Sequence, residues 1–441
     1  MTNKIINEWI DVCESRGKSL WLSNEYNSWT YGELSESLRK YKSQVEELSP
    51  DICMLEGDYS LQSVSFLITC LCFGWQIVPV VSKNENVIKT REEISEANYR
   101  FSEDTNWNIS IINDLKNKTQ IENSGVILFS SGSTGTPKAM CKDMQNMLLN
   151  ISFGGKQVCM GLLLLFDHIG GLNTLFSGMK KGAHLVAPLE RSPRKMAELI
   201  QAYSVRVLPC SPTFLNMMYL DGVFDDYNFK SLRLVTYGTE RMPEDLLIRL
   251  SEKLPRVKFL QTFGTSETGI VQTKSLSSSS TFLTIDDPNV DWKIKDNELW
   301  LKSSDQIKGY INTKETAIND GWFKTGDLVE TKDENYFRII GRKNEIINVG
   351  GEKVLPSEIE DFVMSIGDVV DCTAFSVPNK ITGQAVGIRV VCKNESNQKN
   401  IKKNIRSKSR KKLESFKTPV KIIFDKELIH TERFKKERNN G

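Results

Sequence analysis

The middle of the chain alternates short apolar segments with amphipathic ones, and this alternation constrains the fold more than any other feature. The segments "AHLVAP", "VRVLPC", "LRLVTYG" and "VKFLQTFG" are short and rich in β-branched residues. Helical patterns such as "SPRKMAELIQAYS" and "MPEDLLIRLSEKL" lie between them. Strands that alternate with helices at this spacing predict parallel βαβ sheets with helices on their faces. Ligands of such folds bind where loops leave the carboxyl ends of the strands.

The pattern changes twice toward the C-terminus. From about Asp286 to Phe337 short strands and turns dominate, which predicts a small β-barrel-like section. After Gly341 follow a helix, two strands and a basic helix. The chain has 441 residues, more than one hydrophobic core usually serves. We therefore predict an α/β fold in which residues 1–341 form a large N-terminal domain of parallel-rich βα sheets and residues 342–441 form a small, mobile α+β lid.

Composition places the chain among ordinary globular proteins. The 58 basic and 56 acidic residues nearly cancel, so net charge gives no sign of a nucleic-acid partner. The nine cysteines are an odd number without a repeating spacing, which favours buried free thiols in a reducing compartment. The N-terminus has no apolar signal segment. The most apolar stretch, from Val64 to Val81, is interrupted by Gly74 and predicts a buried helix followed by a buried strand, too broken to span a bilayer. We expect a cytoplasmic protein that does not insert into membranes.

The stretch "ILFSSGSTGTPKAM" places a loop of small residues directly after an apolar strand. Consecutive small residues let several backbone N–H groups turn inward around an anion, and Ser and Thr hydroxyls add further donors. Lys138 at the end of the loop supplies a positive charge. The segment from Ser130 to Lys138 therefore predicts a triphosphate cradle. It is not a Walker loop, which requires the pattern GxxxxGK followed by Ser or Thr.

Four further blocks follow this loop in order: "YGTERMP", "FGTSETG", "GWFKTGDL" and "GRKNEIINVGGEKVLPSEIE". The ordered set resembles the adenylate-forming superfamily of acyl-CoA synthetases, non-ribosomal peptide adenylation domains and luciferases. The resemblance extends from about Trp29 to the end of the chain. It implies that the Ser/Thr/Gly loop holds the β- and γ-phosphates of ATP, and the matching residues are Ser130, Ser131, Gly132, Ser133, Thr134, Gly135 and Lys138.

The same resemblance implies roles for the next two blocks. In "FGTSE", Phe263 would stack on adenine, Ser266 would meet the α-phosphate and Glu267 would bind magnesium. Magnesium suits this arrangement because it takes few protein oxygens and keeps phosphate oxygens as ligands. In "YGTERMP", the residues Gly238, Thr239 and Glu240 would surround the adenine edge.

The ribose and the acyl acceptor are assigned in the same way. Asp327 of "KTGD" would bind both ribose hydroxyls, and Arg342 would reach the same ribose. The glycines Gly350 and Gly351 match a loop that lines the pantetheine tunnel in thioester-forming members. The position about which the small domain rotates is Asn344, where the family usually has Asp or Lys.

His168 and Asp167 are the candidate residues near the acyl group of the substrate. His168 in "LFDHIGGL" matches a residue between the acyl group and the incoming thiol. Its neighbour Asp167 offers a hint of an amino-acid substrate, because members that select amino acids place an Asp against the α-amine. The acyl pocket itself is expected along Pro209–Asn216 and Val235–Thr239.

The C-terminal block departs from the family pattern. Adenylating members carry a Lys that bridges the substrate carboxylate and the α-phosphate, in a block with glycines that this chain lacks. Alignment of "LIHTERFKKER" on Leu428 and Thr431 assigns that role to Lys435, with Lys436 one position away.

The sequence therefore predicts an ATP-dependent acid–thiol ligase that needs ATP and Mg²⁺ and forms an acyl-AMP, pyrophosphate and then a thioester. The expected acceptor is CoA. One alternative is an adenylation enzyme that loads an amino or hydroxy acid on the phosphopantetheine of a separate carrier protein. Another is a degenerate, nucleotide-binding scaffold.

Overall fold

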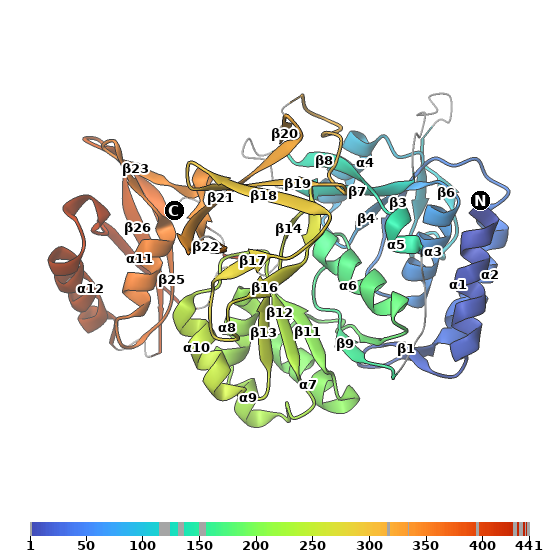
Figure 1. Ribbon diagram of the computed structural model, residues 1–441, viewed down its shortest axis with the longest axis horizontal. Helices are drawn as coiled ribbons and strands as arrows, with labels where there is room; N and C mark the ends of the chain where they lie inside the picture. Colours follow the sequence, from blue (N-terminus) through green and yellow to red (C-terminus); the bar gives the residue numbers. More distant parts are fainter. Residues whose placement is uncertain are drawn as a thin grey trace.

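The structure is a computed structural model of the chain. It describes residues 2–113, 124–130, 136–149, 156–314, 318–333, 335–393, 397–426, 430–431, 435–436 and 438. Figure 1 shows the chain running from the N-terminal layers, through a central sheet, to a small C-terminal unit that contains α11 and α12.

The first sheet contains the strands that the alternating pattern predicted. Its order is β13-β12-β11-β9-β10-β1-β2, and every pairing except that of β1 with β2 is parallel. The strands are β1 (Leu20–Ser23), β2 (Ser28–Thr30), β9 (Cys159–Gly161), β10 (His184–Val186), β11 (Val207–Cys210), β12 (Leu234–Tyr237) and β13 (Lys258–Gln261). The intervening helices are α7 (Pro193–Tyr203), α8 (Pro212–Leu220), α9 (Val223–Asp226) and α10 (Glu244–Lys253). This arrangement confirms the predicted parallel βα architecture.

Helix boundaries in this layer follow from local chemistry. Ser192 caps α7 by accepting a hydrogen bond from the Lys195 N–H, and Pro193 occupies the first turn, where its missing N–H costs nothing. Ser211 caps α8 in the same way. These caps fix the points at which the chain leaves the sheet, so the loops before α7 and α8 have defined positions.

A second sheet has the order β6-β5-β3-β4-β7-β8. Its strands are β3 (Ile52–Glu56), β4 (Gln76–Val80), β5 (Tyr99–Phe101), β6 (Ser110–Ile111), β7 (Gly125–Ser130) and β8 (Lys138–Asp143). The helices of this part of the chain are α1 (Thr2–Arg16), α2 (Tyr31–Val45), α3 (Leu61–Cys72), α4 (Glu85–Ser95), α5 (Gln145–Leu148) and α6 (Ile169–Lys180). The apolar stretch near Val64 is thus a buried helix followed by a strand, as the sequence predicted.

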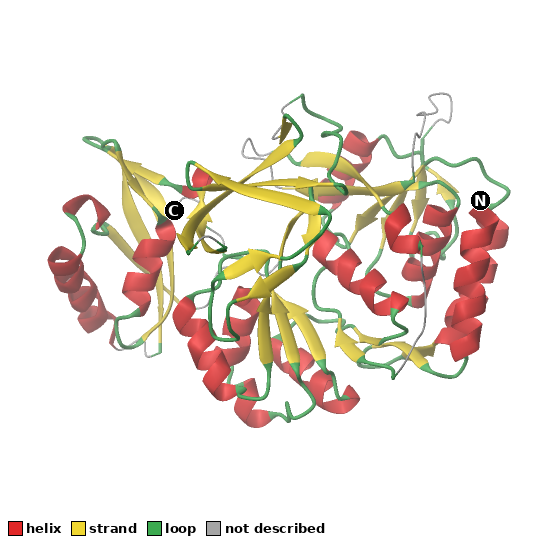
Figure 2. Ribbon diagram, in the orientation of Figure 1, coloured by secondary structure: helices red, strands yellow, loops and turns green. Residues whose placement is uncertain are grey.

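The third sheet is the β-rich section expected after Asp286. It is antiparallel and curled, with the order β16-β17-β22-β21-β19-β18 and with β20 beside β21 (Figure 2). Its strands are β16 (Thr273–Ser275), β17 (Leu283–Ile285), β18 (Val290–Lys295), β19 (Glu298–Ser303), β20 (Ile318–Asn319), β21 (Trp322–Lys332) and β22 (Tyr336–Arg342). A two-stranded ribbon of β14 (Phe263–Thr265) and β15 (Gly269–Val271) precedes it.

The C-terminal unit has a hydrophobic core of its own, drawn from residues 347–422. Its sheet has the order β24-β23-β26-β25, with β27 paired to β26. The elements are η1 (Lys343–Glu345), β23 (Ile347–Val349), β24 (Glu352–Val354), α11 (Pro356–Met364), β25 (Val369–Asn379), β26 (Gly383–Cys392), α12 (Gln398–Lys412), η3 (Ser415–Lys417) and β27 (Lys421–Asp425).

Two further features bear on the sequence predictions. No helix in the described ranges is long and apolar enough to cross a membrane. All nine cysteines lie in the described part of the chain, and each is a free thiol.

Candidate active site

Two adjoining cavities lie where the large domain, the curled sheet and the C-terminal unit meet. The first has a volume of about 940 Å³ and the second about 610 Å³. The predicted site residues that line the first are Ser130, Lys138, His168, Gly238, Thr239, Phe263, Ser266, Glu267, Arg342 and Lys435. The second shares five of these and adds Glu240 and Asp327. Residues from six widely separated segments therefore converge on one continuous site.

The ends of the phosphate loop are held by strand pairing. Ser130 on β7 and Lys138 on β8 are direct antiparallel partners, so the loop begins and ends at one point. Asn312 secures this point, because its side chain accepts a hydrogen bond from the Ala139 N–H at 2.9 Å and donates one to the Pro137 carbonyl at 2.8 Å. The predicted phosphate ligands Ser131, Gly132, Ser133, Thr134 and Gly135 lie outside the described residues.

Tyr310 connects the two charged groups at this end of the cavity. Its hydroxyl donates a hydrogen bond to Glu267 Oε1 at 2.9 Å, and the Lys138 ammonium lies 5.3 Å from the centre of its ring. The sequence analysis missed Tyr310. Tyr310 lies in none of the motifs and follows Glu267 by 43 residues. Only the fold therefore brings Tyr310, Glu267 and Lys138 together.

The cavity chemistry fits a phosphate-bound magnesium ion. Among the described residues, Glu267 is the only carboxylate that lines the first cavity. One of its oxygens accepts a bond from a neutral hydroxyl, so the carboxylate stays oriented without being neutralised. A hard cation that takes one protein carboxylate and several phosphate oxygens suits such a site.

The segment Gly238–Glu240 has a backbone conformation that suggests a functional constraint. A Cβ atom on Gly238 would lie 2.8 Å from the Thr262 carbonyl oxygen, so a side chain does not fit there. Thr239 has φ of +71°, which is unusual for a β-branched residue. Strain of this kind persists where the surroundings impose it, and it is concentrated at binding sites.

Four side-chain polar atoms around the second cavity have no hydrogen-bond partner in the described part of the chain; one is Thr239 Oγ1, and the other three belong to buried residues. These three are Thr213 Oγ1, Asn216 Oδ1 and Gln261 Oε1. Their residues are only 3–6% exposed, so the desolvation of these atoms is uncompensated. Two are amide oxygens, which accept hydrogen bonds of the kind an adenine amino group donates. An adenine ring bound beside Phe263 would therefore have acceptors of this kind in the lining of the same cavity. The sequence analysis did not single out Asn216 or Gln261 for this purpose.

The expected acyl-pocket segments divide between the two cavities. Pro209 lines the first, whereas Asn216 lines the second. Along β12, Thr236 faces the first cavity, but Val235 and Tyr237 are buried in the core because successive strand side chains point to opposite faces.

Asp327 and Arg342 meet because β21 and β22 pair. The two residues are direct antiparallel partners, and Arg342 Nε lies 3.0 Å from Asp327 Oδ1. Asp327 is 5% exposed, and burial raises its pKa while Arg342 opposes that shift. Its N–H donates to Thr325 Oγ1 at 3.0 Å, which fixes the strand at this point. The pair thus forms an oriented, charged wall of the second cavity.

The two adjacent lysines of the C-terminal block have different surroundings. Lys435 lines both cavities, and its charge acts on Asp327. Lys436 instead donates from Nζ to Asp371 Oδ1 at 2.8 Å and to the Cys372 carbonyl at 2.9 Å, inside the C-terminal unit. Burial alone would lower the pKa of Lys436, but Asp371 and Glu360 raise it above its usual value. Lys435 therefore lines both cavities, whereas Lys436 lines the second but not the first, and its ammonium is paired within the C-terminal unit.

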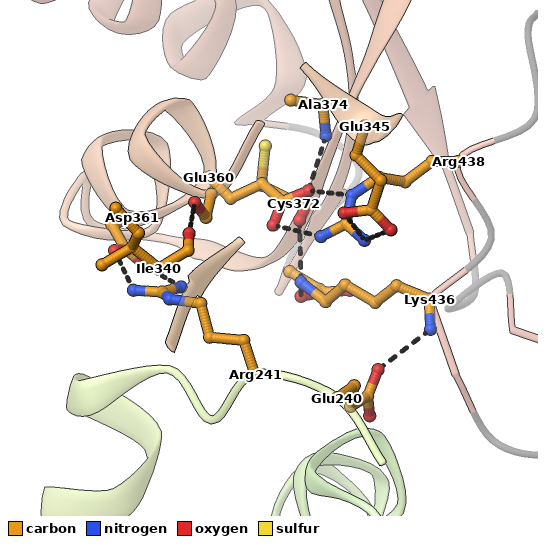
Figure 3. Close-up of polar contacts among 12 residues, drawn as sticks. Glu240, Arg241, Ile340, Glu345, Glu360, Asp361, Cys372, Ala374, Lys436 and Arg438 are labelled. Atoms are coloured by element: carbon orange, nitrogen blue, oxygen red, sulfur yellow. Dashed lines mark hydrogen bonds and ion pairs between the residues drawn. The ribbon is translucent and has the colours of Figure 1, made fainter. Parts of the chain in front are cut away.

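Arg438 and Glu240 anchor this terminal segment on both sides (Figure 3). Arg438 forms a two-point pair with the buried Glu360, at 3.2 and 3.0 Å, and also contacts Glu345. Glu240 accepts hydrogen bonds from the Thr213 N–H at 2.7 Å and the Lys436 N–H at 3.2 Å. The carboxylate of Glu240 therefore connects the large domain to the terminal segment, and burial raises its pKa.

His168 and Asp167 are adjacent in sequence but have different environments. His168 lines the first cavity and caps α6, and its Nδ1 accepts a hydrogen bond from the Gly170 N–H at 3.2 Å. Asp167 is buried and pairs with Arg91 at 2.7 Å. Because that carboxylate already has a cationic partner and does not line either cavity, the hint of an amine-binding Asp loses its support.

Gly350 and Gly351 lie in the turn between β23 and β24, with φ of +62° and +97°. They line neither cavity, whereas Asn344 lines the first. In this domain arrangement the terminal lysine faces the site and the predicted tunnel glycines do not.

Known proteins resemble this chain in sequence and in fold. The model of the AMP-binding enzyme family matches residues 64–318, and that of the AMP-binding enzyme C-terminal domain matches residues 358–435. The chain is 28% identical over 291 residues to 4-coumarate-CoA ligase 1 of Narcissus pseudonarcissus, covering 58% of this chain and 53% of that one. It is 24% identical over 437 residues to 4-coumarate–CoA ligase-like 9 of Arabidopsis thaliana, covering 85% and 78%. With several curated relatives, including the first, the match spans about half of their length.

Solved structures share the fold. The o-succinylbenzoate CoA synthetase of Bacillus subtilis, in complex with an acyl-adenylate, has a TM-score of 0.77 at 19% identity, covering 98% of this chain and 96% of that one. An anthranilate CoA ligase in complex with anthranoyl-AMP has a TM-score of 0.75 at 16% identity, covering 96% and 94%. Since the first family model alone matches more than half of the chain, this protein belongs to the AMP-binding enzyme family.

Proposed function

We propose that this protein is an ATP-dependent acid–thiol ligase that joins a carboxylic acid to CoA through an acyl-adenylate. The observation that carries the proposal is the convergence of Lys138, Glu267 and Lys435 on one cavity. Relatives named as CoA ligases and a fold shared with CoA synthetases support the same reaction.

In the first step, a carboxylate oxygen of the acid attacks the α-phosphorus of ATP, and the bond to pyrophosphate breaks. No general base is needed, because the carboxylate is already ionised. Lys138 and the phosphate loop hold the departing phosphates, and Lys435 neutralises charge between the carboxylate and the α-phosphate. Magnesium held at Glu267 would offset further phosphate charge.

The large domain positions the nucleotide for this attack. Phe263 offers a face for the adenine ring, and Asp327 with Arg342 offers an oriented acceptor and donor for the ribose. Fixing both reactants before reaction removes an entropic cost and accounts for much of the rate enhancement expected.

In the second step, the thiol of CoA attacks the acyl carbonyl and AMP leaves. The structure has Lys435 in the site and Gly350 and Gly351 outside it. We therefore assign this arrangement to adenylation, and thioester formation requires the C-terminal unit, residues 342–441, to turn about Asn344. His168 then borders the path between acyl group and thiol.

Two measurements test the proposal together. Acid-dependent exchange of labelled pyrophosphate into ATP tests the first step, and CoA-dependent release of AMP tests the second. Pyrophosphate exchange could proceed while thioester forms on a pantetheinylated carrier protein and not on CoA. That result would show that the protein is a carrier-loading adenylation enzyme. Tight ATP binding without exchange for any acid would favour the nucleotide-binding scaffold.

The free thiols of all nine cysteines support a reducing compartment. We propose the cytoplasm, and fractionation of cells with antibody detection tests this location.

A further inference from the structure

One face of α6 is mostly polar and lines the first cavity, together with the apolar Ile169 at the start of the helix. The residues Gly170, Asn173, Thr174 and Ser177 follow the helical spacing of three and four, and Lys181 continues the same line directly after the helix. The other face packs in the core through Leu172, Leu175, Phe176 and Met179, which are 0–1% exposed. Polar side chains on this face would not stabilise the binding of a purely apolar ligand.

The opposite wall of the cavity is mainly apolar. Val207 and Pro209 of β11, Leu234 of β12 and Met160 of β9 line it. An acid that occupies this space therefore meets apolar strands on one side and a polar helix on the other.

The polar groups on α6 are available to a ligand. Thr174 donates its hydroxyl to the Gly170 carbonyl at 2.8 Å and is satisfied. The side chains of Asn173 and Ser177 make no hydrogen bond with any described residue, although both line the cavity. An amide and a hydroxyl in these positions favour a ligand with polar atoms of its own.

The far end of this face is cationic. Lys156 and Lys181 both line the cavity, and neither forms an ion pair with a described residue. Their segments lie together, because the Gln157 side chain donates to the Gly182 carbonyl at 3.0 Å. Neighbouring positive charges repel unless an anion lies between them.

We propose that the acid carries a second carboxylate at its far end, which binds at Asn173, Ser177 and Lys181. This inference rests on the proposed function and names its substrate class. The helical rise of about 1.5 Å per residue places Asn173 about 7.5 Å and Ser177 about 13.5 Å along the axis from His168. The second carboxylate thus binds well beyond the reacting one, and the carbon chain between them lies against β11 and β12.

The test compares monocarboxylic acids with α,ω-dicarboxylic acids of matched chain length in pyrophosphate exchange, a reaction without CoA. The wild-type protein is expected to prefer a dicarboxylic acid by about 10–100-fold in kcat/KM, the range that a hydrogen bond to a charged group provides. Lys181→Met is expected to remove about tenfold of that preference, through a higher KM for the dicarboxylic acid.

Lys180→Met is the matched control. Lys180 is the preceding residue, and its ammonium donates to the Asn146 carbonyl rather than to the cavity. A preference for monocarboxylic acids, or equal effects of the two variants on dicarboxylic acids, would overturn the inference. Pyrophosphate exchange with any acid would still support the proposed function. Absence of exchange with every acid would overturn both. Since no CoA is present, an effect of Lys181→Met cannot come from a phosphate of CoA.

Discussion

The adjacent lysines 435 and 436 provide the sharpest prediction, because the structure gives them separate tasks. Lys436→Met removes the cation from Asp371, whose side chain is 9% exposed, and from the Cys372 carbonyl. Loss of one partner of a buried pair costs about 3–5 kcal/mol, and we expect about 3 kcal/mol because the Lys436 side chain keeps 14% of its surface exposed.

Lys435→Ala is expected to change the free energy of unfolding by less than about 1 kcal/mol, because its side chain lines the cavity. Its effect should be on catalysis. Removing one preorganised charge from a transition state lowers turnover by about 10²–10³-fold, so pyrophosphate exchange should fall by that factor.

The stability assay must report on the C-terminal unit. All eight tryptophans lie at or before Trp322, so their fluorescence does not monitor that unit. Hydrogen exchange of β25 amides, followed by mass spectrometry, does. The double variant Lys436→Met/Asp371→Leu is the control, because removal of the stranded carboxylate should recover part of the lost protection.

The reasoning is refuted if Lys436→Met keeps wild-type protection in β25 but loses exchange activity while Lys435→Ala retains it. That outcome would mean that Lys436 is the adenylation lysine.

Three further predictions test the site and its support. Tyr310→Phe should raise the magnesium concentration needed for half-maximal exchange several-fold, because Glu267 loses the hydroxyl that orients it; Tyr26→Phe, on a residue that is 82% exposed, should have no effect. Gly238→Ala should destabilise the protein by about 1–3 kcal/mol and weaken ATP binding in calorimetry, because its methyl group would meet the Thr262 carbonyl, whereas Gly309→Ala has open space and should be neutral. Burial lowers the pKa of His184 to about 4. Between about pH 6.5 and pH 4 the unfolded chain therefore binds a proton that the folded chain does not. The free energy of unfolding should fall by about 2 kcal/mol as the pH is lowered through that range. Urea titrations at several pH values check this last slope, and His184→Gln should flatten it.

Much of the fold could be predicted because its signals are local. The β-branched segments and capped helices of the first sheet, and the helix–strand unit near Val64, formed where the periodicity placed them. The antiparallel register that joins Asp327 to Arg342 was not visible in the sequence, although the motifs suggested that both residues serve one ribose.

The ordered motifs predicted residues that line the two cavities, but they gave no sign of the residues that only the fold brings there. Tyr310, Asn216 and Gln261 lie in no motif, and their importance arises from contacts across the fold or from buried atoms without partners. The preference for Lys435 over Lys436 also depended on the structure, because Lys436 pairs with Asp371 and only Lys435 lines the first cavity. The polar face of α6 could in principle be predicted from its helical spacing, but only the structure shows that this face lines a cavity.

The central claim, attack of a carboxylate on the α-phosphorus of ATP, is tested most directly by isotope transfer. The acid with the fastest exchange would be labelled with ¹⁸O in its carboxylate and incubated with ATP, magnesium and CoA. Mass spectrometry of the products should find one ¹⁸O atom in AMP and none in pyrophosphate. Label in inorganic phosphate with formation of ADP, or unlabelled AMP, would contradict the mechanism.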